Sequence, residues 1–151
     1  MVKFRSATHA DKQILDDFLQ GIITAERPMD HSLAPGHITY YDPMGFVDDP
    51  EAVLIVAEID ERVVGCGAVT IEPAKPYFKY DKVGHIQMMY VVPEHRGKGI
   101  NRGVMDALIA FATGRGVANF KLTVYPDNEG AIRAYQKSGF YAALIEMRMH
   151  L

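Results

Sequence analysis

One segment in the middle of the chain limits the possible folds more than any other part of the sequence. Residues 85–92, HIQMMYVV, place apolar side chains on both faces of an extended chain, and Pro93 ends the run, as is typical of a buried strand. A turn with two glycines follows, and apolar residues then recur at helical spacing over about 98–113. Because the next apolar run, at about 118–124, alternates like a strand, the helix predicts a crossover between two parallel strands.

The rest of the chain supplies further strands and helices. Between Glu26 and Glu51, four prolines interrupt any periodicity, which predicts a long irregular excursion. The other elements, in chain order, are a strand within residues 1–7, a helix over 11–23, a hairpin of strands at 53–58 and 62–71, a short helix capped by Asp127 or Asn128 and ending before Gly139, and a strand at 141–151. This order predicts an α/β (α+β) fold with a mixed sheet.

Length and composition indicate one domain and exclude several kinds of partner. At 151 residues and 48% apolar, the chain is too short for two domains of ordinary size, so we expect residues 1–151 to form a single domain. A net charge of −3, without a basic stripe, argues against nucleic acid as a partner. The six histidines have no metal-ligand spacing with cysteine or carboxylates, which predicts that there is no metal site.

Few sequence features bear on the cell compartment. The single cysteine, Cys66, cannot form an internal disulfide and lies in the apolar run VVGCGAV, where a small buried side chain is expected. No charged leader followed by an apolar stretch opens the chain, and no run of about 18 apolar residues occurs. We therefore expect a soluble, cytoplasmic protein with no membrane contact.

The turn before the crossover helix carries more than turn chemistry requires. Gly97 and Gly99 are accompanied by three cations, Arg96, Lys98 and Arg102. Free N–H groups at a helix start carry a partial positive charge, and glycines let an anion approach the backbone, so a ligand with phosphates is expected here. The spacing fits neither the phosphate loop G-x-x-x-x-G-K-[ST] nor the dinucleotide fingerprint G-x-G-x-x-G, whose third glycine falls one place off.

Two motifs resemble those of a known family. The run VVPEHRGKGINRGVMDALIAFA is similar to the acyl-CoA-binding motif of the GNAT superfamily of N-acyltransferases, in which Arg or Gln is followed by two residues, Gly, one residue, and Gly or Ala. Arg96 and Gly99 match, and Asn101 departs from the last position. A position that contributes only its N–H group can carry a side chain that points away. The run VYPDNEGAIRAYQKSGF resembles the second motif, with Asn128 and Tyr135.

This resemblance covers the chain except for residues 26–51 and 72–84, and it implies a fold and a cofactor site. The implied fold is a mixed, mostly antiparallel twisted sheet of about six to seven strands with about four helices, in which the fourth and fifth strands splay apart. The pantetheine arm of acetyl-CoA lies in that cleft, and the pyrophosphate lies on N–H groups of the turn. The implied cofactor-binding residues are Met89, Tyr90, Val91, Arg96, Gly97, Lys98, Gly99, Asn101, Arg102, Asn128 and Tyr135. Phosphate contact and simple solvation stay open for the side chains of Arg96 and Arg102.

The resemblance also implies direct attack by an amine on the thioester carbonyl of acetyl-CoA. Tyr135 matches the family's general acid, and a phenol with an ordinary pKa of about 10 is well matched to an alkyl thiolate. No metal takes part in this chemistry.

The base is less defined than the acid. In some branches of the family a glutamate lies eleven residues before the Arg or Gln of the motif, and this count leads to His85, whose imidazole suits a proton acceptor at neutral pH. Simple alternation puts His85 on the same face as Gln87, Met89 and Val91, although a bulge could change that facing. Glu72, at the end of the third strand, is a rival base, and solvent without a dedicated residue is a third option.

The irregular excursion suggests the charge of the acceptor. It lies where GNAT proteins shape the acceptor pocket, and it holds one arginine and six carboxylates: Glu26, Asp30, Asp42, Asp48, Asp49 and Glu51. This composition favours a small cationic amine or a lysine-like group over an anionic acceptor. Two other functions stay open, a non-catalytic acyl-CoA-binding or regulatory module and a nucleotide-binding enzyme, and the chain is compatible with a homodimer.

Overall fold

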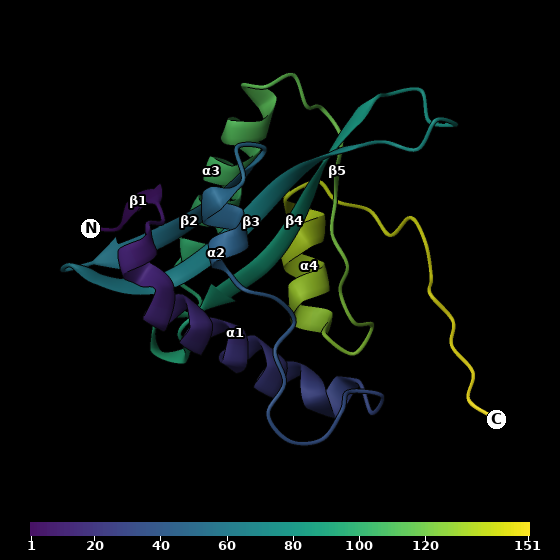
Figure 1. The fold of residues 1–151 in the computed structure, drawn as a ribbon, viewed down its shortest axis with the longest axis horizontal. Coiled ribbons are helices and arrows are strands. Elements are labelled where there is room, and N and C mark those ends of the chain that lie inside the picture. Colours follow the sequence, from purple (N-terminus) through teal and green to yellow (C-terminus); the bar gives the residue numbers. More distant parts are fainter.

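The computed structural model describes residues 1–151 and contains one five-stranded sheet with the order β1-β2-β3-β4-β5. The strands are β1 (Lys3–Ser6), β2 (Ala52–Ile59), β3 (Arg62–Pro73), β4 (Lys82–Val91) and β5 (Phe120–Lys121). Neighbouring strands are antiparallel from β1 to β4, whereas β4 and β5 are parallel. The mixed, mostly antiparallel sheet confirms the predicted fold class (Figure 1).

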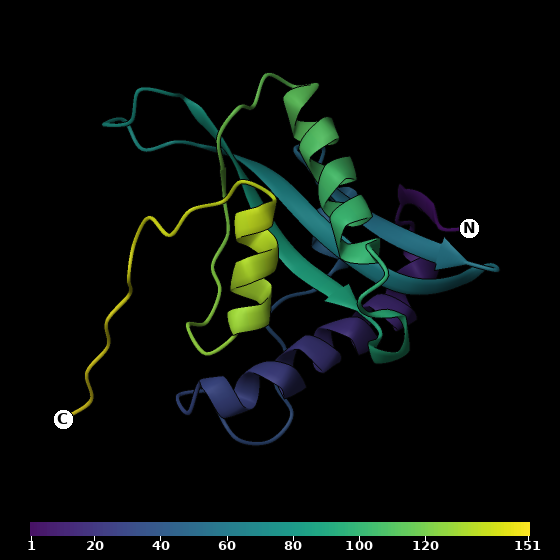
Figure 2. The ribbon, with the colours of Figure 1, turned by 180° about the vertical axis from the view of Figure 1, so that it is seen from behind.

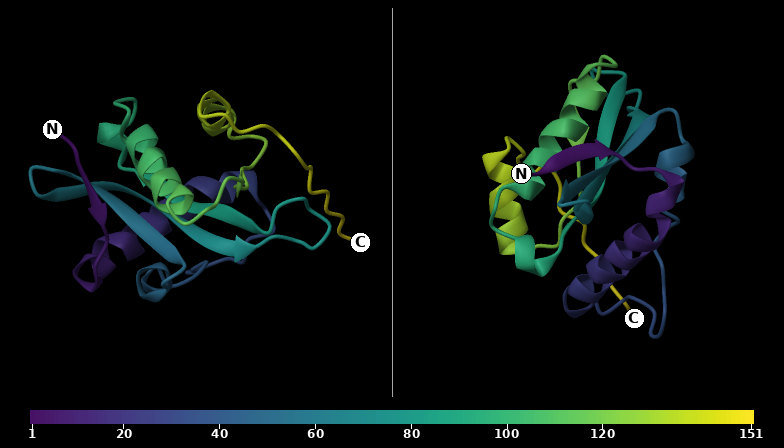
Figure 3. Two further views of the ribbon diagram at one scale, coloured as in Figure 1. Left: turned by 90° about the horizontal axis from the view of Figure 1, so that it is seen from above. Right: turned by 90° about the vertical axis from the view of Figure 1, so that its left-hand side faces the viewer.

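Four α-helices cover the two faces of the sheet: α1 (Lys12–Glu26), α2 (Met44–Asp48), α3 (Ile100–Thr113) and α4 (Glu129–Lys137). Seen along the sheet, α1 and α2 lie on one face, and α3 and α4 lie on the other (Figure 3). The predicted crossover is α3, which joins the parallel strands β4 and β5. None of these helices combines the length and the apolar composition needed to cross a membrane.

Apolar side chains at helical spacing hold each layer to the sheet. On α1, Leu15, Phe18 and Leu19 are buried, and on α3 Val104 and Leu108 are fully buried. The two sets pack on opposite faces of β2, β3 and β4, so each face has its own core. We call them the α1 core and the α3 core.

Cys66 lies in the α1 core and is completely buried, as its apolar surroundings in the sequence predict. Burial raises the pKa of its thiol above the ordinary range, because the charged thiolate loses its hydration. Its thiol group contacts the carbonyl oxygen of Met88. Cys66 is therefore a packed core residue rather than a reactive thiol.

A bulge in β4 changes which side chains face each layer. The register of β3 and β4 shifts between Cys66 and Ala68, so that Met88 and Met89 both lie opposite Gly67. Met88 has a left-handed φ of 55°, which is uncommon for a residue with a side chain. Met88 packs in the α1 core and Met89 in the α3 core. The simple alternation predicted through this strand is therefore wrong beyond Gln87.

Three expectations about individual elements are corrected. The sheet has five strands rather than six to seven, because residues 141–151 are extended but lie outside the sheet, with Leu144 at 94% exposed. The predicted strand at 118–124 is shortened to the two residues of β5. The excursion from Glu26 to Glu51 is not wholly irregular, since it contains α2, whose apolar side chains pack into the α1 core.

Candidate active site

Two glycines with left-handed backbone form the connection between β4 and α3. Gly97 has a φ of 75°, and Gly99, the N-cap of α3, has a φ of 80°. A methyl group at either position would meet no heavy atom within 4 Å, so open space lies in front of both. We call residues 96–99 the glycine turn. Gly103 serves a different purpose, because a methyl group there would lie 2.2 Å from the ring of Phe4, which packs against it.

The glycine turn presents unused backbone donors. None of the N–H groups of residues 97–102 donates to an oxygen atom of the protein, and the first bond in this region runs from the Gly103 N–H to the Gly99 carbonyl. These groups lie at the start of a 14-residue helix, whose dipole adds partial positive charge. The arrangement suits an anion with several oxygen atoms.

The cations of this region have distinct roles. Arg96 Nε donates to the Val91 carbonyl at 2.8 Å, and its guanidinium lies 5.5 Å from the centre of the Tyr90 ring. Arg96 therefore braces the glycine turn against β4, a role that neither sequence alternative included. Arg102 pairs with a carboxylate one turn further along α3, at 3.1 Å, and its side chain and that of Lys98 are exposed beside the turn.

The parallel strands β4 and β5 are paired only at their start. The two paired positions are Gly84 with Phe120 and His85 with Lys121, and β4 has no strand partner on this side over residues 86–91. Figure 2 shows α4 beside the segment where the strands part. The separation predicted between the fourth and fifth strands is present, and the part of β4 expected to meet the pantetheine arm lies along it.

Tyr135 is placed by α4 next to this separation. It belongs to the α3 core and meets the ring of Phe140 edge-on, with ring centres 6.0 Å apart. Burial, followed by the negative charge of Glu26, raises the pKa of Tyr135. Asn128 begins α4, and its side chain accepts the Ala131 N–H at 3.3 Å, so its observed contact is that of a helix cap.

The two predicted base candidates are in contact. His85 Nδ1 lies 2.9 Å from Glu72 Oε2, and Glu72 Oε1 lies 3.2 Å from Lys121 Nζ. His85 lies across from Thr70, on the face opposite to Ile71, which packs beneath α3. The side chain of His85 is thus on the α1 side of the sheet.

This facing corrects the expected grouping of His85 with Met89 and Val91, both of which face α3. The extra residue at the bulge reverses the alternation between these positions. Sequence reasoning missed Lys121, because only the parallel register of β4 and β5 brings it to Glu72.

Most acidic residues of the excursion have hydrogen-bond or charge partners, several of them from distant parts of the chain. Asp30 is buried and accepts hydrogen bonds from Ser32, Tyr125 and Arg148. These bonds lower the pKa of Asp30 below its usual range, with those from Ser32 and Tyr125 contributing most. Asp48 contacts His9, Asp42 lies near Lys12, and Asp49 accepts the N–H of Glu51.

Glu26 is the carboxylate of the excursion whose charge reaches Tyr135. Its carboxylate accepts the hydroxyl of Tyr40 at 2.7 Å and has no cationic partner. It is half-buried at the end of α1. Burial raises the pKa of Tyr40 and Tyr41, and Glu26 raises both further, through its hydrogen bond and charge at Tyr40 and through its charge at Tyr41. Glu26 is thus an uncompensated negative charge close to several tyrosines.

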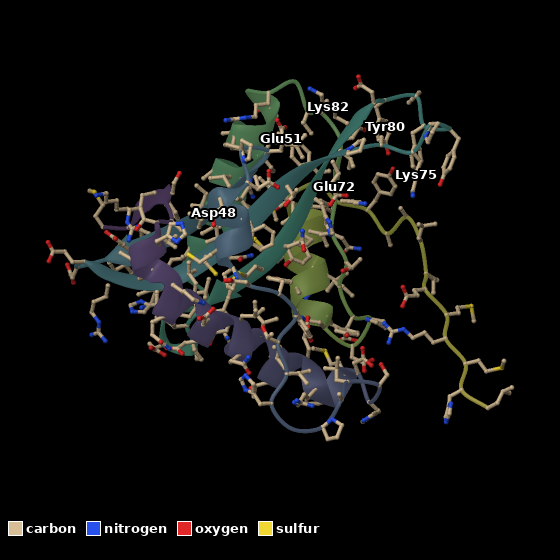
Figure 4. All side chains as sticks on the ribbon, viewed as in Figure 1. Asp48, Glu51, Glu72, Lys75, Tyr80 and Lys82 are labelled. Atoms are coloured by element: carbon tan, nitrogen blue, oxygen red, sulfur yellow. The ribbon has the colours of Figure 1, made fainter.

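A surface hollow adjoins the Glu72 side chain. It is lined by Glu51, Ile71, Glu72, Pro73, Asp81 and Lys82. Of these, Glu51, Glu72 and Lys82 are labelled in Figure 4. No three histidine, cysteine or carboxylate side chains are grouped so as to hold a metal ion.

Comparisons with known proteins place these features in a family. The acetyltransferase (GNAT) family matches residues 17–140. An uncharacterised N-acetyltransferase of Archaeoglobus fulgidus is 32% identical over 128 residues, which are 83% of this chain and 86% of that protein. A mycothiol acetyltransferase of Paenarthrobacter aurescens is 28% identical over 92 residues, which are 61% of this chain but only 28% of that protein.

The fold has solved counterparts. The crystal structure of a predicted acetyltransferase with acetyl-CoA from Clostridium acetobutylicum superposes with a TM-score of 0.77 at 21% identity, covering 99% of this chain and 96% of that one. At this identity the likeness concerns the fold alone.

Proposed function

The chain belongs to the acetyltransferase (GNAT) family, and from this premise we propose that it moves an acetyl group from acetyl-CoA to a primary amine of a small molecule or peptide. One observation carries the proposal. The N–H groups of residues 97–102 at the start of α3 donate to no oxygen atom of the protein, and an added Cβ at Gly97 or Gly99 would meet open space. This is a fitting cradle for a pyrophosphate.

Acetyl-CoA fits the site as an extended substrate. Its pyrophosphate would accept the N–H groups of residues 97–102, with the exposed cations Lys98 and Arg102 beside it. Its pantetheine arm would run along the edge of β4 near residues 89–91, where β4 has no strand partner. This path directs the thioester toward Tyr135, which lies beside the same separation.

The proposed reaction is a direct acyl transfer. The amine nitrogen attacks the thioester carbonyl carbon, a new C–N bond forms, and the C–S bond breaks. Tyr135 donates its proton to the departing sulfur, and its raised pKa keeps this proton in place at neutral pH. The amine proton goes to His85, directly or through water. The products are an amide and free coenzyme A.

The charge of Glu26 supports a cationic acceptor. The reacting amine must be neutral to attack, so Glu26 would bind a second cationic group on the same molecule. Its carboxylate meets only the neutral hydroxyl of Tyr40, and its charge acts on the hydroxyl of Tyr135. A cation placed there would compensate a half-buried negative charge close to the proposed acid.

The proposal is tested by two measurements on the purified protein. Acetyl-CoA is expected to raise the melting temperature more than ATP or NAD does, because a ligand that binds only the folded state stabilises it by mass action. Release of free thiol from acetyl-CoA should then depend on added amine. Stabilisation without amine-dependent release across a broad amine panel would support a non-catalytic acyl-CoA-binding module. Equal stabilisation by all three ligands would support a nucleotide-binding enzyme.

The acceptor proposal has its own test. Glu26→Gln should raise KM for amines with a second cationic group and leave KM unchanged for amines without one. Asp48→Asn is the matched control, because Asp48 lies in the same excursion but is paired with His9. A preference for anionic acceptors in the wild-type protein would refute the idea.

A further inference from the structure

Glu72 and His85 form a connected unit where β4 and β5 stop pairing. Three adjacent strands contribute to it: Glu72 from β3, His85 from β4 and Lys121 from β5. One carboxylate oxygen of Glu72 lies 2.9 Å from His85 Nδ1, and the other lies 3.2 Å from Lys121 Nζ. Both oxygens are therefore engaged, which restricts rotation of the carboxylate.

The contact determines which imidazole nitrogen can accept a proton. An ionised carboxylate only accepts hydrogen bonds, so Nδ1 of His85 must carry the hydrogen that it shares with Glu72. The lone pair is then on Nε2, which has no hydrogen-bond partner in the protein. About a quarter of the His85 side chain is exposed, so Nε2 is open to a substrate or a water molecule.

The charge state of Glu72 agrees with this arrangement. Burial alone would raise its pKa, but the hydrogen bonds from His85 and Lys121 outweigh burial and lower the pKa. Glu72 is thus held ionised and is a poor proton acceptor at neutral pH.

We propose that Glu72 is a positioning residue for His85 and not an alternative base, an inference that rests on the proposed acyl transfer. Glu72 orients the ring, keeps the hydrogen on Nδ1 and leaves Nε2 to take the proton of the attacking amine. The ring then becomes an imidazolium that donates to Glu72 through Nδ1, and Glu72 stays ionised. Lys121 holds the other oxygen of Glu72 and keeps its carboxylate aligned.

The kinetic test compares single and double variants with acetyl-CoA and an accepted amine. His85→Ala should lower kcat about 10²- to 10⁴-fold, the usual contribution of a general base. Glu72→Gln should lower kcat about 10- to 100-fold and leave KM for acetyl-CoA unchanged. The amide of Gln is neutral and can donate a hydrogen bond to Nδ1 of His85. The ring hydrogen then moves to Nε2, and the nitrogen that would take the amine proton is lost. In the His85→Ala background, Glu72→Gln should have no further effect.

A control and a second readout keep the outcomes distinct. Asp81→Asn removes a carboxylate that lines the same hollow without contacting His85, and it should leave kcat unchanged. Nitrogen NMR of the His85 ring reports the tautomer without any turnover, and it should show a hydrogen on Nδ1 in the wild type and on Nε2 in Glu72→Gln. An unprotonated Nδ1 in the wild type, or equal losses from Glu72→Gln with and without His85, would overturn the inference. Failure of acetyl-CoA to bind would instead overturn the proposed function and leave the NMR result standing.

Discussion

Replacing Gly99 by alanine separates the conformational and ligand-binding demands on the glycine turn. Gly99 has φ 80° and ψ 7°, and an added methyl group would meet no heavy atom within 4 Å. The cost to the folded protein is therefore backbone strain alone, about 1–2 kcal/mol for an L-residue in this conformation. For a chain of this size each kcal/mol corresponds to about 2–4 °C, so the melting temperature should fall by about 2–8 °C.

The same methyl group should weaken acetyl-CoA binding through a different cause. It would occupy open space at the glycine turn, whose N–H groups we propose to bind the pyrophosphate. Losing one hydrogen bond to a charged partner costs about 1.5–3 kcal/mol, which raises Kd about 10- to 150-fold. Titration calorimetry with acetyl-CoA, at a temperature where both proteins are folded, measures this change.

Gly116 provides the matched control at the other end of α3. It has φ 81°, and a methyl group there also meets open space. Gly116→Ala should lower the melting temperature by a similar amount and leave Kd unchanged. If Gly99→Ala binds acetyl-CoA like the wild type, or if both variants weaken binding equally, the pyrophosphate does not bind on this turn.

Three further outcomes are expected. Tyr135→Phe keeps the ring but removes the acid, so kcat should fall about 10²- to 10⁴-fold at unchanged KM for acetyl-CoA. Because the pKa of Tyr135 is raised, the phenol should keep its proton between about pH 7 and 9, and a wild-type kcat that declines over this range would contradict the assignment. The hydrogen bonds from Arg5 lower the pKa of Asp11 in the folded protein. The stability that this pair contributes is therefore complete above the unfolded pKa of about 3.9 and is lost as the pH falls through the folded pKa. In urea unfolding, Asp11→Asn should lower the free energy of unfolding by about 1–3 kcal/mol at pH 7 and by less at about pH 2. Gly103→Val should destabilise the fold by about 1–3 kcal/mol, because its Cβ would lie 2.2 Å from the Phe4 ring, while Kd for acetyl-CoA stays unchanged.

Local sequence patterns were sufficient for most of the fold. The apolar spacing of α1 and α3 and the alternation around Cys66 predicted the layers, because burial of an apolar stripe requires one period in a helix and another in a strand. The glycines at 97 and 99 predicted a special turn, and both have the left-handed backbone that only glycine adopts easily. The two family motifs led to the acetyltransferase (GNAT) family that matches residues 17–140.

Other features depended on contacts between distant parts of the chain. The bulge at Met88 and the side of the sheet on which His85 lies follow from the register of two strands, which no local period encodes. Residues 141–151 have a strand-like sequence but form no strand, since β-propensity depends on the packing context of the chain.

The sequence by itself determined most of the elements, the special backbone of the glycine turn and the family, because each depends on neighbouring residues along the chain. Only the tertiary structure decided that Glu72 and His85 are in contact, since this contact joins residues thirteen positions apart on adjacent strands. It also decided which excursion carboxylates are compensated, because Asp30 meets Arg148 from the other end of the chain while Glu26 meets no cation. Charge compensation and proton transfer depend on distances in space, and these distances are set by packing.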